Sequence, residues 1–316
     1  MTEIRAFNDE TLALAATTIR SGGLVAFPTE TVYGLGADSF NAKAVTQIFA
    51  AKGRPSFNPL ISHISSFEML EDLAVPDSRA QALAKKFWPG PLTLILPRRQ
   101  SHSALDLVCA GLPNISVRMP SHPIALALIT AAATPIAAPS ANRSQTISPT
   151  CAQHVADSLF GQVDLILDGG ACKIGVESTI VNLTTKDTVI LRAGGLSKEA
   201  LEEFLGEKVL LSQGNPNLPT SPGQMLKHYA PRLPTRINVT PSMLAEDEFY
   251  IGFGVMDGNL NLSPSGDTTE AAANLFSFMH QAETQTLHPK IAIAPIPDYG
   301  LGLAINDRIK RASYQG

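Results

Sequence analysis

Short apolar runs alternate with amphipathic stretches over the first two thirds of the chain. Apolar positions with a helical period, preceded by capping residues or followed by glycine, predict helices, and these fall at 9–21, 42–52, 66–88, 123–132, 151–160 and 198–205. Compact runs rich in leucine, isoleucine and valine predict buried strands, at 24–27, 60–64, 92–96, 115–119, 135–138, 163–170, 177–183 and 189–195. We expect the last two strands to be neighbours.

The composition changes at Leu211, where proline and glycine replace the apolar periodicity. Residues 208–234 are therefore predicted to form a linker. Alternating strand and helix patterns follow it and are typical of a parallel sheet, with strands expected at 235–239, 249–253 and 291–296 and helices at 267–280 and 301–312. The chain thus divides into a first domain at 1–207, a linker at 208–234 and a small α/β domain at 235–316.

Composition and charge narrow the class of protein. Apolar residues make up 44% of the chain and charged residues 16%, which is enough to bury a core. The formal net charge of −4 argues against a dedicated nucleic-acid coat but is compatible with a local basic pocket. The three cysteines form no CxxC pair or cysteine–histidine cluster, which argues against a zinc site or a disulfide framework. Without a leader-like segment or an apolar run of about 20 residues, the chain is predicted to be cytoplasmic and to make no membrane contact.

The segment 28–36 (PTETVYGLG) follows a predicted strand and concentrates hydroxyls, a carboxylate and glycines. Threonine and tyrosine supply hydrogen bonds with few rotamers to freeze, and glycine lets the backbone approach a ligand closely. The segment can therefore be the edge of a site for a small polar ligand, or a glycine-rich turn after a core strand. Taken alone, it favours the turn.

Other polar residues stand at the ends of predicted strands or in the adjoining loops, and four of them are cationic. With Thr31 and Tyr33 of segment 28–36 included, the whole set of polar candidates is Thr31, Tyr33, Lys52, Arg54, Asn58, His63, Arg118, Ser140, Asn142, Ser148, Ser178 and Arg192. The chain has no Gly-x-Ser-x-Gly elbow and no Walker loop. Such a set suits a pocket for a polyanion and a small zwitterion, because arginine and lysine bind phosphate and carboxylate groups.

Several of these residues also have a purely structural interpretation. Lys52 and Arg54 flank the end of a predicted helix, where cations are favourable in any case. Arg118 can extend its charge to the surface or point into a polar cavity. His63 can be a satisfied buried histidine, and the polar loop at 140–150 can cap the following helix instead of binding phosphate.

The ordered set of motifs resembles the threonylcarbamoyl-AMP synthase family. The resemblance rests on segments 28–36, 52–63, 116–120, 138–150, 177–181 and 191–192. Segments 221–231 and 306–310 resemble the long, two-domain form of the family.

The resemblance implies a fold and a reaction. The fold is a YrdC-like α/β domain, a twisted open sheet with helices around a basic cavity, followed by a small Rossmann-like α/β domain. The reaction converts L-threonine, bicarbonate and ATP into threonylcarbamoyladenylate and pyrophosphate, with Mg²⁺ accompanying the nucleotide. The product serves the modification of the adenosine next to the tRNA anticodon. The implied partners are therefore these substrates and the tRNA threonylcarbamoyltransferase machinery, with weak or indirect tRNA binding.

The resemblance also implies roles for single residues. Threonine would be bound by Thr31, His63, Arg118 and Ser178, and Arg118 would pair with its carboxylate. The catalytic cations that face the phosphates and the carbamate would be Lys52 and Arg54. The nucleotide site would consist of Arg54, Asn58, Asn114, Ser140, Asn142, Ser148, Arg192 and the linker residue Tyr229, which would close over the pocket. Asn114 departs from the threonine common in the family, and the linker after Gly223 is less basic than usual. No protein ligand for a metal is implied.

Two other functions stay open. A pure RNA-binding module would also use a basic pocket, but the net charge and the lack of interleaved aromatic and cationic residues argue against it. Carbamoyl transfer of another kind occurs in larger enzymes with a similar domain, and this chain lacks the cysteine pairs that those proteins carry.

Overall fold

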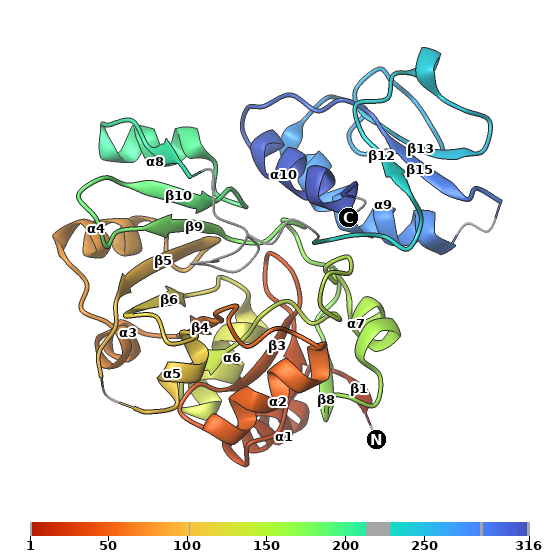
Figure 1. The fold of residues 1–316 in the computed structure, drawn as a ribbon. Helices are drawn as coiled ribbons and strands as arrows, with labels where there is room; N and C mark the ends of the chain where they lie inside the picture. The colour runs from red at the N-terminus through yellow and green to blue at the C-terminus, as the bar shows by residue number, and fades with distance from the viewer. Residues whose placement is uncertain (1, 101, 213–227, 285–286, 315–316) are drawn as a thin grey trace.

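The computed structural model describes residues 2–100, 102–212, 228–284 and 287–314. They form a large domain on an eleven-stranded sheet and a small domain on a four-stranded sheet, which Figure 1 shows side by side. Most of the predicted linker, 213–227, lies outside the described residues.

The large sheet is mixed, in the order β1-β8-β2-β3-β7-β4-β6-β5-β9-β10-β11. Its strands are β1 (Glu3–Ala6), β2 (Val25–Phe27), β3 (Gly34–Asp38), β4 (Ile61–His63), β5 (Leu92–Pro97), β6 (Asn114–Arg118), β7 (Ile136–Ala137), β8 (Leu165–Asp168), β9 (Thr179–Asn182), β10 (Val189–Arg192) and β11 (Leu210–Leu211). As predicted, β9 and β10 are neighbours, and they pair antiparallel. The order brings segments from across the sequence together, since β7 lies between β3 and β4.

The helices of this domain bury their apolar faces in its core clusters, and α1 and α6 also contact each other. They are α1 (Asp9–Arg20), α2 (Ala42–Lys52), α3 (Phe67–Leu73), α4 (Ser78–Phe87), α5 (Leu105–Val108), α6 (Pro123–Ala132), α7 (Ala152–Leu159) and α8 (Lys198–Leu205). Of all the helices that the structure describes, none combines the length and the apolar character needed to cross a membrane.

The single helix predicted at 66–88 is wrong, because the segment forms two helices, α3 and α4. Ala74 is extended, with φ −141°, and Pro76 disfavours a helical conformation for the residue before it. Each helix has its own N-cap, with Ser66 accepting from the Met69 amide and Asp77 from the Ala80 amide.

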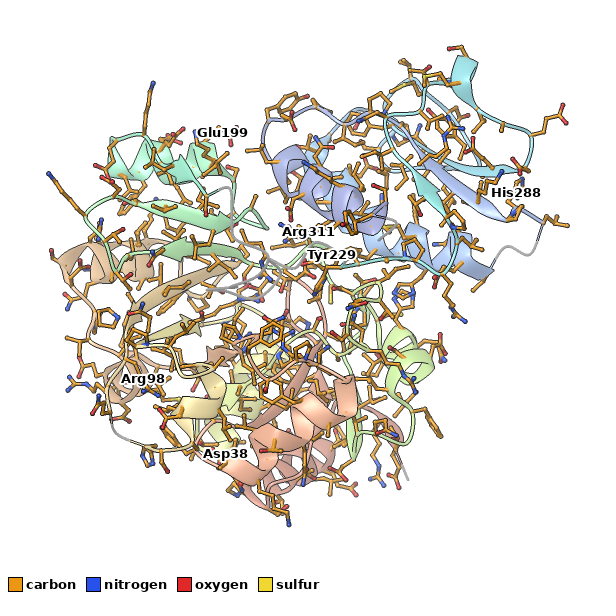
Figure 2. All side chains as sticks on the ribbon, viewed as in Figure 1. Asp38, Arg98, Glu199, Tyr229, His288 and Arg311 are labelled. Atoms are coloured by element: carbon orange, nitrogen blue, oxygen red, sulfur yellow. The ribbon has the colours of Figure 1, made fainter. Side chains whose placement is uncertain are left out.

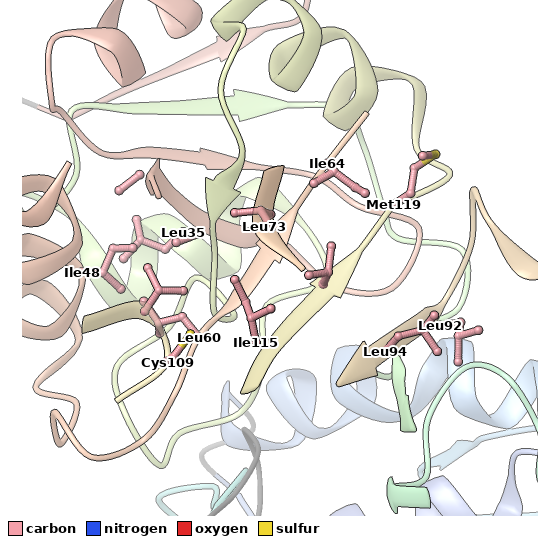
Figure 3. Packing of buried hydrophobic residues seen from close by; sticks show 14 of the residues in the cluster. Leu35, Ile48, Leu60, Ile64, Leu73, Leu92, Leu94, Cys109, Ile115 and Met119 are labelled. Atoms are coloured by element: carbon pink, nitrogen blue, oxygen red, sulfur yellow. The ribbon is translucent and has the colours of Figure 1, made fainter. Parts of the chain in front are cut away.

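Separate apolar clusters make up the core of the large domain, and Figure 3 shows residues of one of them. Leu35 of β3, Ile48 of α2, Leu60 and Ile115 belong to one buried cluster, and Cys109 packs with them as a small hydrophobic residue. Fully burying one such aliphatic side chain stabilises a fold by roughly 1.5–3 kcal/mol. This core fixes the strand ends that carry the polar residues described below.

The small domain is a parallel α/β unit, as predicted. Its sheet has the order β12-β15-β13-β14, and each of the three pairings is parallel. Its elements are β12 (Thr235–Arg236), the 3₁₀ turn η1 (Pro241–Met243), β13 (Glu248–Gly252), β14 (Leu260–Asn261), α9 (Thr268–Thr284), β15 (Lys290–Ile293) and α10 (Gly302–Ala312).

The last three residues of segment 28–36 begin a strand, β3, so the segment is not only a turn. Glycine is depleted in strands, so the sequence pattern hid it. A Cβ on Gly36 would lie 2.7 Å from Phe27 and 2.8 Å from Ile136, so the missing side chain makes room for core packing. The short elements β1, α5, η1 and β14 also escaped prediction. So did β11, which pairs with β10 although its residues were predicted to belong to the linker.

Candidate active site

A cavity of about 50 Å³ lies at the ends of several strands of the large sheet. The residues predicted to bind substrates that line it are Thr31, Arg54, His63, Arg118, Ser140, Ser178, Arg192 and Tyr229. Strand pairing explains their convergence. In the parallel pair of β4 and β6, His63 stands opposite Arg118, and Ser140 forms a bridge with Gly34 at the start of β3.

Arg118 points into this cavity and is paired with an acid. Its guanidinium donates to Glu30 Oε1 at 2.6 Å, to Thr31 Oγ1 at 2.9 Å and to the Gly90 carbonyl at 3.2 Å. Glu30 also accepts from the Ser121 amide at 3.1 Å. Both charged side chains are almost fully buried, so the ion pair is desolvated and its geometry is fixed from three directions.

His63 forms the neighbouring part of the wall. Its Nδ1 lies 3.2 Å from the carbonyl oxygen of Ile61, and its ring meets Phe27 edge to face at 6.2 Å between centroids. Burial, together with the charge of Arg118, lowers the pKa of His63 to about 3. The imidazole is therefore neutral at physiological pH and can contact a ligand without adding a charge.

The low pKa values of two buried histidines predict that the folded protein is less stable in acid. Burial lowers the pKa values of His63 and His228 to about 3, whereas an unfolded histidine titrates near 6.5. Between these values the unfolded chain binds protons that the folded chain does not. The two histidines therefore contribute their full stabilisation of the folded state above about pH 6.5, and this contribution is lost as the pH falls toward 3. Between pH 7.5 and 5.5 we expect each histidine to lower the free energy of unfolding by about 1.4 kcal/mol.

Urea unfolding at both pH values measures this effect. His63→Gln and His228→Gln should each reduce the difference between the two pH values by about 1.4 kcal/mol, while His102→Gln, at an exposed position, should leave it unchanged. An undiminished difference in both buried variants would contradict the expectation.

Lys52 and Arg54 form a basic wall at the end of α2, where Gly53 ends the helix with a left-handed φ of 61°. The Lys52 ammonium donates to the Ser140 carbonyl at 2.6 Å and to the Asn142 carbonyl, which fixes that loop from behind the cavity. Burial and the charge of Arg54 hold the pKa of Lys52 well below its usual range. Arg54 lines the cavity, and burial lowers its pKa to about 10.

Asn58 lies against Arg54, because its carbonyl and that of Pro59 accept from the guanidinium at 3.2 and 2.9 Å. Asn142 is buried in the loop after β7 and donates to the Thr146 carbonyl at 2.9 Å. Within the described part of the chain, its Oδ1 has no hydrogen-bond partner. Both residues thus stand behind the cavity wall, next to the two cations.

Ser178 and Arg192 close the opposite side. Arg192 donates to the Ser178 carbonyl at 2.9 Å and to its hydroxyl at 3.2 Å, and that hydroxyl also lies 2.7 Å from Thr93 Oγ1. Glu177, the preceding residue, accepts from the Ser148 hydroxyl at 2.6 Å. Ser148 thereby reaches the cavity through a carboxylate that lines it.

His228 and Tyr229 cover the cavity from the end of the linker segment, and Figure 2 shows Tyr229 between the two domains. Tyr229 is fully buried and adopts a φ of 61°, a left-handed conformation that is strained for a bulky residue. Its ring stacks on Phe276 of α9 at 5.4 Å. Its hydroxyl has no hydrogen-bond partner among the residues described, which is unusual for a buried phenol.

Asn114 and Tyr33 lie farther from the cavity than the other predicted residues and take no part in its wall. Asn114 begins β6, at the far end of the strand from Arg118, and is only half-buried. Tyr33 turns into the fold, where its hydroxyl donates to the Gly170 carbonyl at 2.8 Å.

Sequence reasoning missed Glu177 and His228 as parts of the wall, and Glu30 as the acid that pairs with Arg118. A signal existed for Glu30 alone: it is the acid of segment 28–36, which directly follows an apolar predicted strand, and the chain also places Arg118 in an apolar strand. Buried charges of opposite sign usually occur together. Nothing local indicates the contacts of Glu177 and His228.

Comparisons with known proteins agree with this arrangement. Residues 17–194 match the family model described as "Telomere recombination", and residues 196–313 match that of the threonylcarbamoyl-AMP synthase C-terminal domain. The threonylcarbamoyl-AMP synthase of Pyrococcus abyssi is 43% identical over 96% of this chain and 94% of its own length. That of Bacillus subtilis is 42% identical over 97% of this chain and 94% of its own length.

A solved structure extends the match to three dimensions. The crystal structure of P. abyssi Sua5 complexed with L-threonine superposes with a TM-score of 0.90, at 40% identity, over 99% of this chain and 97% of that one. Because family models match both domains and relatives are more than 40% identical over nearly the whole chain, the chain belongs to the threonylcarbamoyl-AMP synthase family.

Proposed function

We propose that this enzyme makes threonylcarbamoyladenylate and pyrophosphate from L-threonine, bicarbonate and ATP. The observation that carries the proposal is the charge of the cavity. Four cationic side chains are buried at its wall or behind it: Lys52, Arg54, Arg118 and Arg192. Two acids oppose them, since Glu177 lines the cavity and Glu30 pairs with Arg118. Buried cations in excess need anions to compensate them, and a triphosphate and a carboxylate supply them.

Threonine would bind in the part of the cavity that Arg118 lines. One carboxylate, that of Glu30, already pairs with this guanidinium, and a second can use the remaining N–H groups of its fork. Thr31, His63 and Ser178 surround this point with two hydroxyls and a neutral imidazole, which suit the hydroxyl and amine of threonine. The relative from P. abyssi has been crystallised with L-threonine.

The nucleotide end is the side of Arg54 and Arg192. Arg54 faces the phosphates, and Ser140, Asn142 and Ser148 supply hydroxyl and amide groups from one loop. Asn58 supports Arg54 through its carbonyl. A contact from Asn114 requires the nucleotide to extend along β6 toward the other end of that strand.

The chemistry needs positioning and charge neutralisation more than a nucleophile from the protein. The free amine of threonine attacks the bicarbonate carbon, and one bicarbonate oxygen leaves as water together with an amine proton, which gives the carbamate. A carbamate oxygen then attacks the α-phosphate of ATP, and pyrophosphate is the leaving group. Lys52 and Arg54 act by stabilising the charge that develops on these oxygens. Because about 50 Å³ holds only a few water molecules, the substrates enter only when His228 and Tyr229 move aside.

Mg²⁺ fits this site as a companion of ATP. Among the residues described, no three histidines, cysteines or acids form a group that could hold a metal ion. Glu30 and Glu177 are each engaged by an arginine. We therefore expect Mg²⁺ to bind mainly phosphate oxygens and water, as it does in many nucleotide sites.

The location in the cell and the next step in the reaction sequence are also proposals. A cytoplasmic enzyme would pass its product to the tRNA threonylcarbamoyltransferase machinery. A function in RNA binding alone is less consistent with the chain, because the cations face a buried cavity and the formal net charge is −4.

Pyrophosphate release tests the proposal. The protein is incubated with ATP, Mg²⁺, bicarbonate and L-threonine, and pyrophosphate is followed while mass spectrometry detects the adenylate. We expect release only when threonine and bicarbonate are both present. Release that continues without either of them, or the absence of an adenylate product, would refute the assignment.

A further inference from the structure

An arginine of the small domain reaches the wall of the cavity. Arg308 lies on α10 and is fully buried. Its Nε donates to Glu177 Oε2 at 2.8 Å, and its Nη1 donates to Asp307 Oδ2 at 2.7 Å. Glu177 belongs to the large domain and lines the cavity. A direct ionic contact therefore joins the last described helix to the site.

Adhesion between the domains does not require this pair. Exchanging a buried ion pair for apolar residues of similar size is often neutral or stabilising, whereas removing one partner costs roughly 3–5 kcal/mol. An apolar interface already surrounds it, since Val32 and Val176 of the large domain pack in the same cluster as Phe276 and Ile305 of the small one. The pair is better explained by what it positions.

On one side, the pair fixes a serine on the nucleotide side of the cavity. The second oxygen of Glu177 accepts from the Ser148 hydroxyl at 2.6 Å. Burial raises the pKa of Glu177, but the charges of Arg308 and Arg192 and the hydrogen bond from Ser148 outweigh it and lower the pKa to about 2. The carboxylate thus stays ionised, and Arg308, Glu177 and Ser148 form one hydrogen-bonded line.

On the other side, the same arginine holds the tyrosine that covers the cavity. The guanidinium carbon of Arg308 lies 5.2 Å from the centroid of the Tyr229 ring, within the range of a cation–π contact. Phe276 stacks on the same ring, so side chains of α9 and α10 determine where the ring lies. In the described part of the chain, Arg308 Nη2 has no hydrogen-bond partner.

We propose that Arg308 is a positioning residue for the nucleotide, through which the small domain sets Ser148 and Tyr229 in their working places. The inference rests on the proposed synthase function. It gives the small domain a part in the reaction, because the site is complete only when α10 is docked on Glu177.

Steady-state kinetics of Arg308→Lys test the inference, because lysine keeps the charge and loses the geometry of the guanidinium. We expect kcat/KM for ATP to fall by about 10- to 100-fold, mostly through a higher KM, as for misplaced positioning groups. KM for threonine should stay within about twofold, since Arg118 and Thr31 do not contact this line. Lys310→Met, at an exposed position of the same helix, is the matched control and should change neither constant.

A second variant separates positioning from folding. In Arg308→Met/Glu177→Gln both charges of the pair are removed together, so that neither of the two is left buried without the other. We expect it to fold, as judged by circular dichroism, and to show the same rise in KM for ATP.

The inference is overturned if folded variants keep the wild-type KM for ATP, if both substrates lose affinity equally, or if activity falls only in proportion to the unfolded fraction. Wild-type protein that fails to release pyrophosphate would refute the synthase function and this inference together, whereas active wild-type with unaffected variants refutes this inference alone.

Discussion

Replacing Arg118 with alanine is expected to weaken threonine binding strongly and to leave ATP binding much closer to that of the wild type. Arg118 stands at the end of β6, opposite His63, and three acceptors orient its guanidinium. Truncating one partner of a buried, hydrogen-bonded charge pair costs roughly 2–5 kcal/mol. We therefore expect the Kd for threonine to rise at least about 30-fold.

The same change also weakens the fold. Without Arg118, the Glu30 carboxylate is buried without a cation, which costs roughly 3–5 kcal/mol. A companion variant, Arg118→Gln/Glu30→Gln, removes both charges and should regain much of this stability without regaining threonine binding. Comparing the two variants separates the loss of a ligand contact from the loss of the fold.

Calorimetric titration with threonine and with ATP, together with thermal unfolding, measures both effects. The control is Arg98→Ala, which removes an ion pair whose acid, Asp106, is 65% exposed. Arg98 does not line the cavity, so ligand binding should be unaffected. Equal losses of threonine and ATP affinity in folded Arg118→Ala would show that the carboxylate role is wrong.

Gly194→Ala is expected to inactivate the enzyme although it adds a single methyl group. A Cβ at this position would lie 2.3 Å from the Glu177 carbonyl oxygen and 2.4 Å from the carbonyl carbon of Ser178. Both are backbone atoms, so no flexible side chain can give way. The chain that carries Glu177 and Ser178 must shift, and a displacement of about 1 Å in a positioned site can lower activity by about 100-fold.

The control for this variant is Gly206→Ala, at the end of α8. A Cβ there meets no heavy atom within 4 Å, although the residue has a φ of +68°. The substitution should cost roughly 1–2 kcal/mol of backbone strain and leave kcat unchanged. Similar kinetic constants for Gly194→Ala and Gly206→Ala, in folded protein, would contradict the proposed close approach.

The sequence predicted most elements of the fold because the signals for them are local. The limits of α6 match the predicted 123–132, and α2 ends at Lys52 before Gly53, as its pattern indicates. The split between α3 and α4 was also readable, in Pro76 and its flanking caps. The strand β3 was not, since its glycines serve side chains that arrive from β2 and β7.

For the site, the sequence determined which residue types stand at the strand ends, and the order of the motifs determined the family. Only the tertiary structure decided their partners. Arg118 meets Glu30, Lys52 holds the carbonyls of a loop some 90 residues away, and Asn114 lies away from the cavity although its motif suggested a contact.

Segment 28–36 illustrates the division. Its hydroxyls and glycines can be read from the sequence, but Thr31 reaches the cavity while Tyr33 and Gly36 serve the interior. Helix periods, caps and turns depend on neighbours within a few residues, so the sequence by itself determines them. The pairing of buried charges depends on which strands become adjacent and on how α10 docks, and those long-range choices are made only when the whole chain packs.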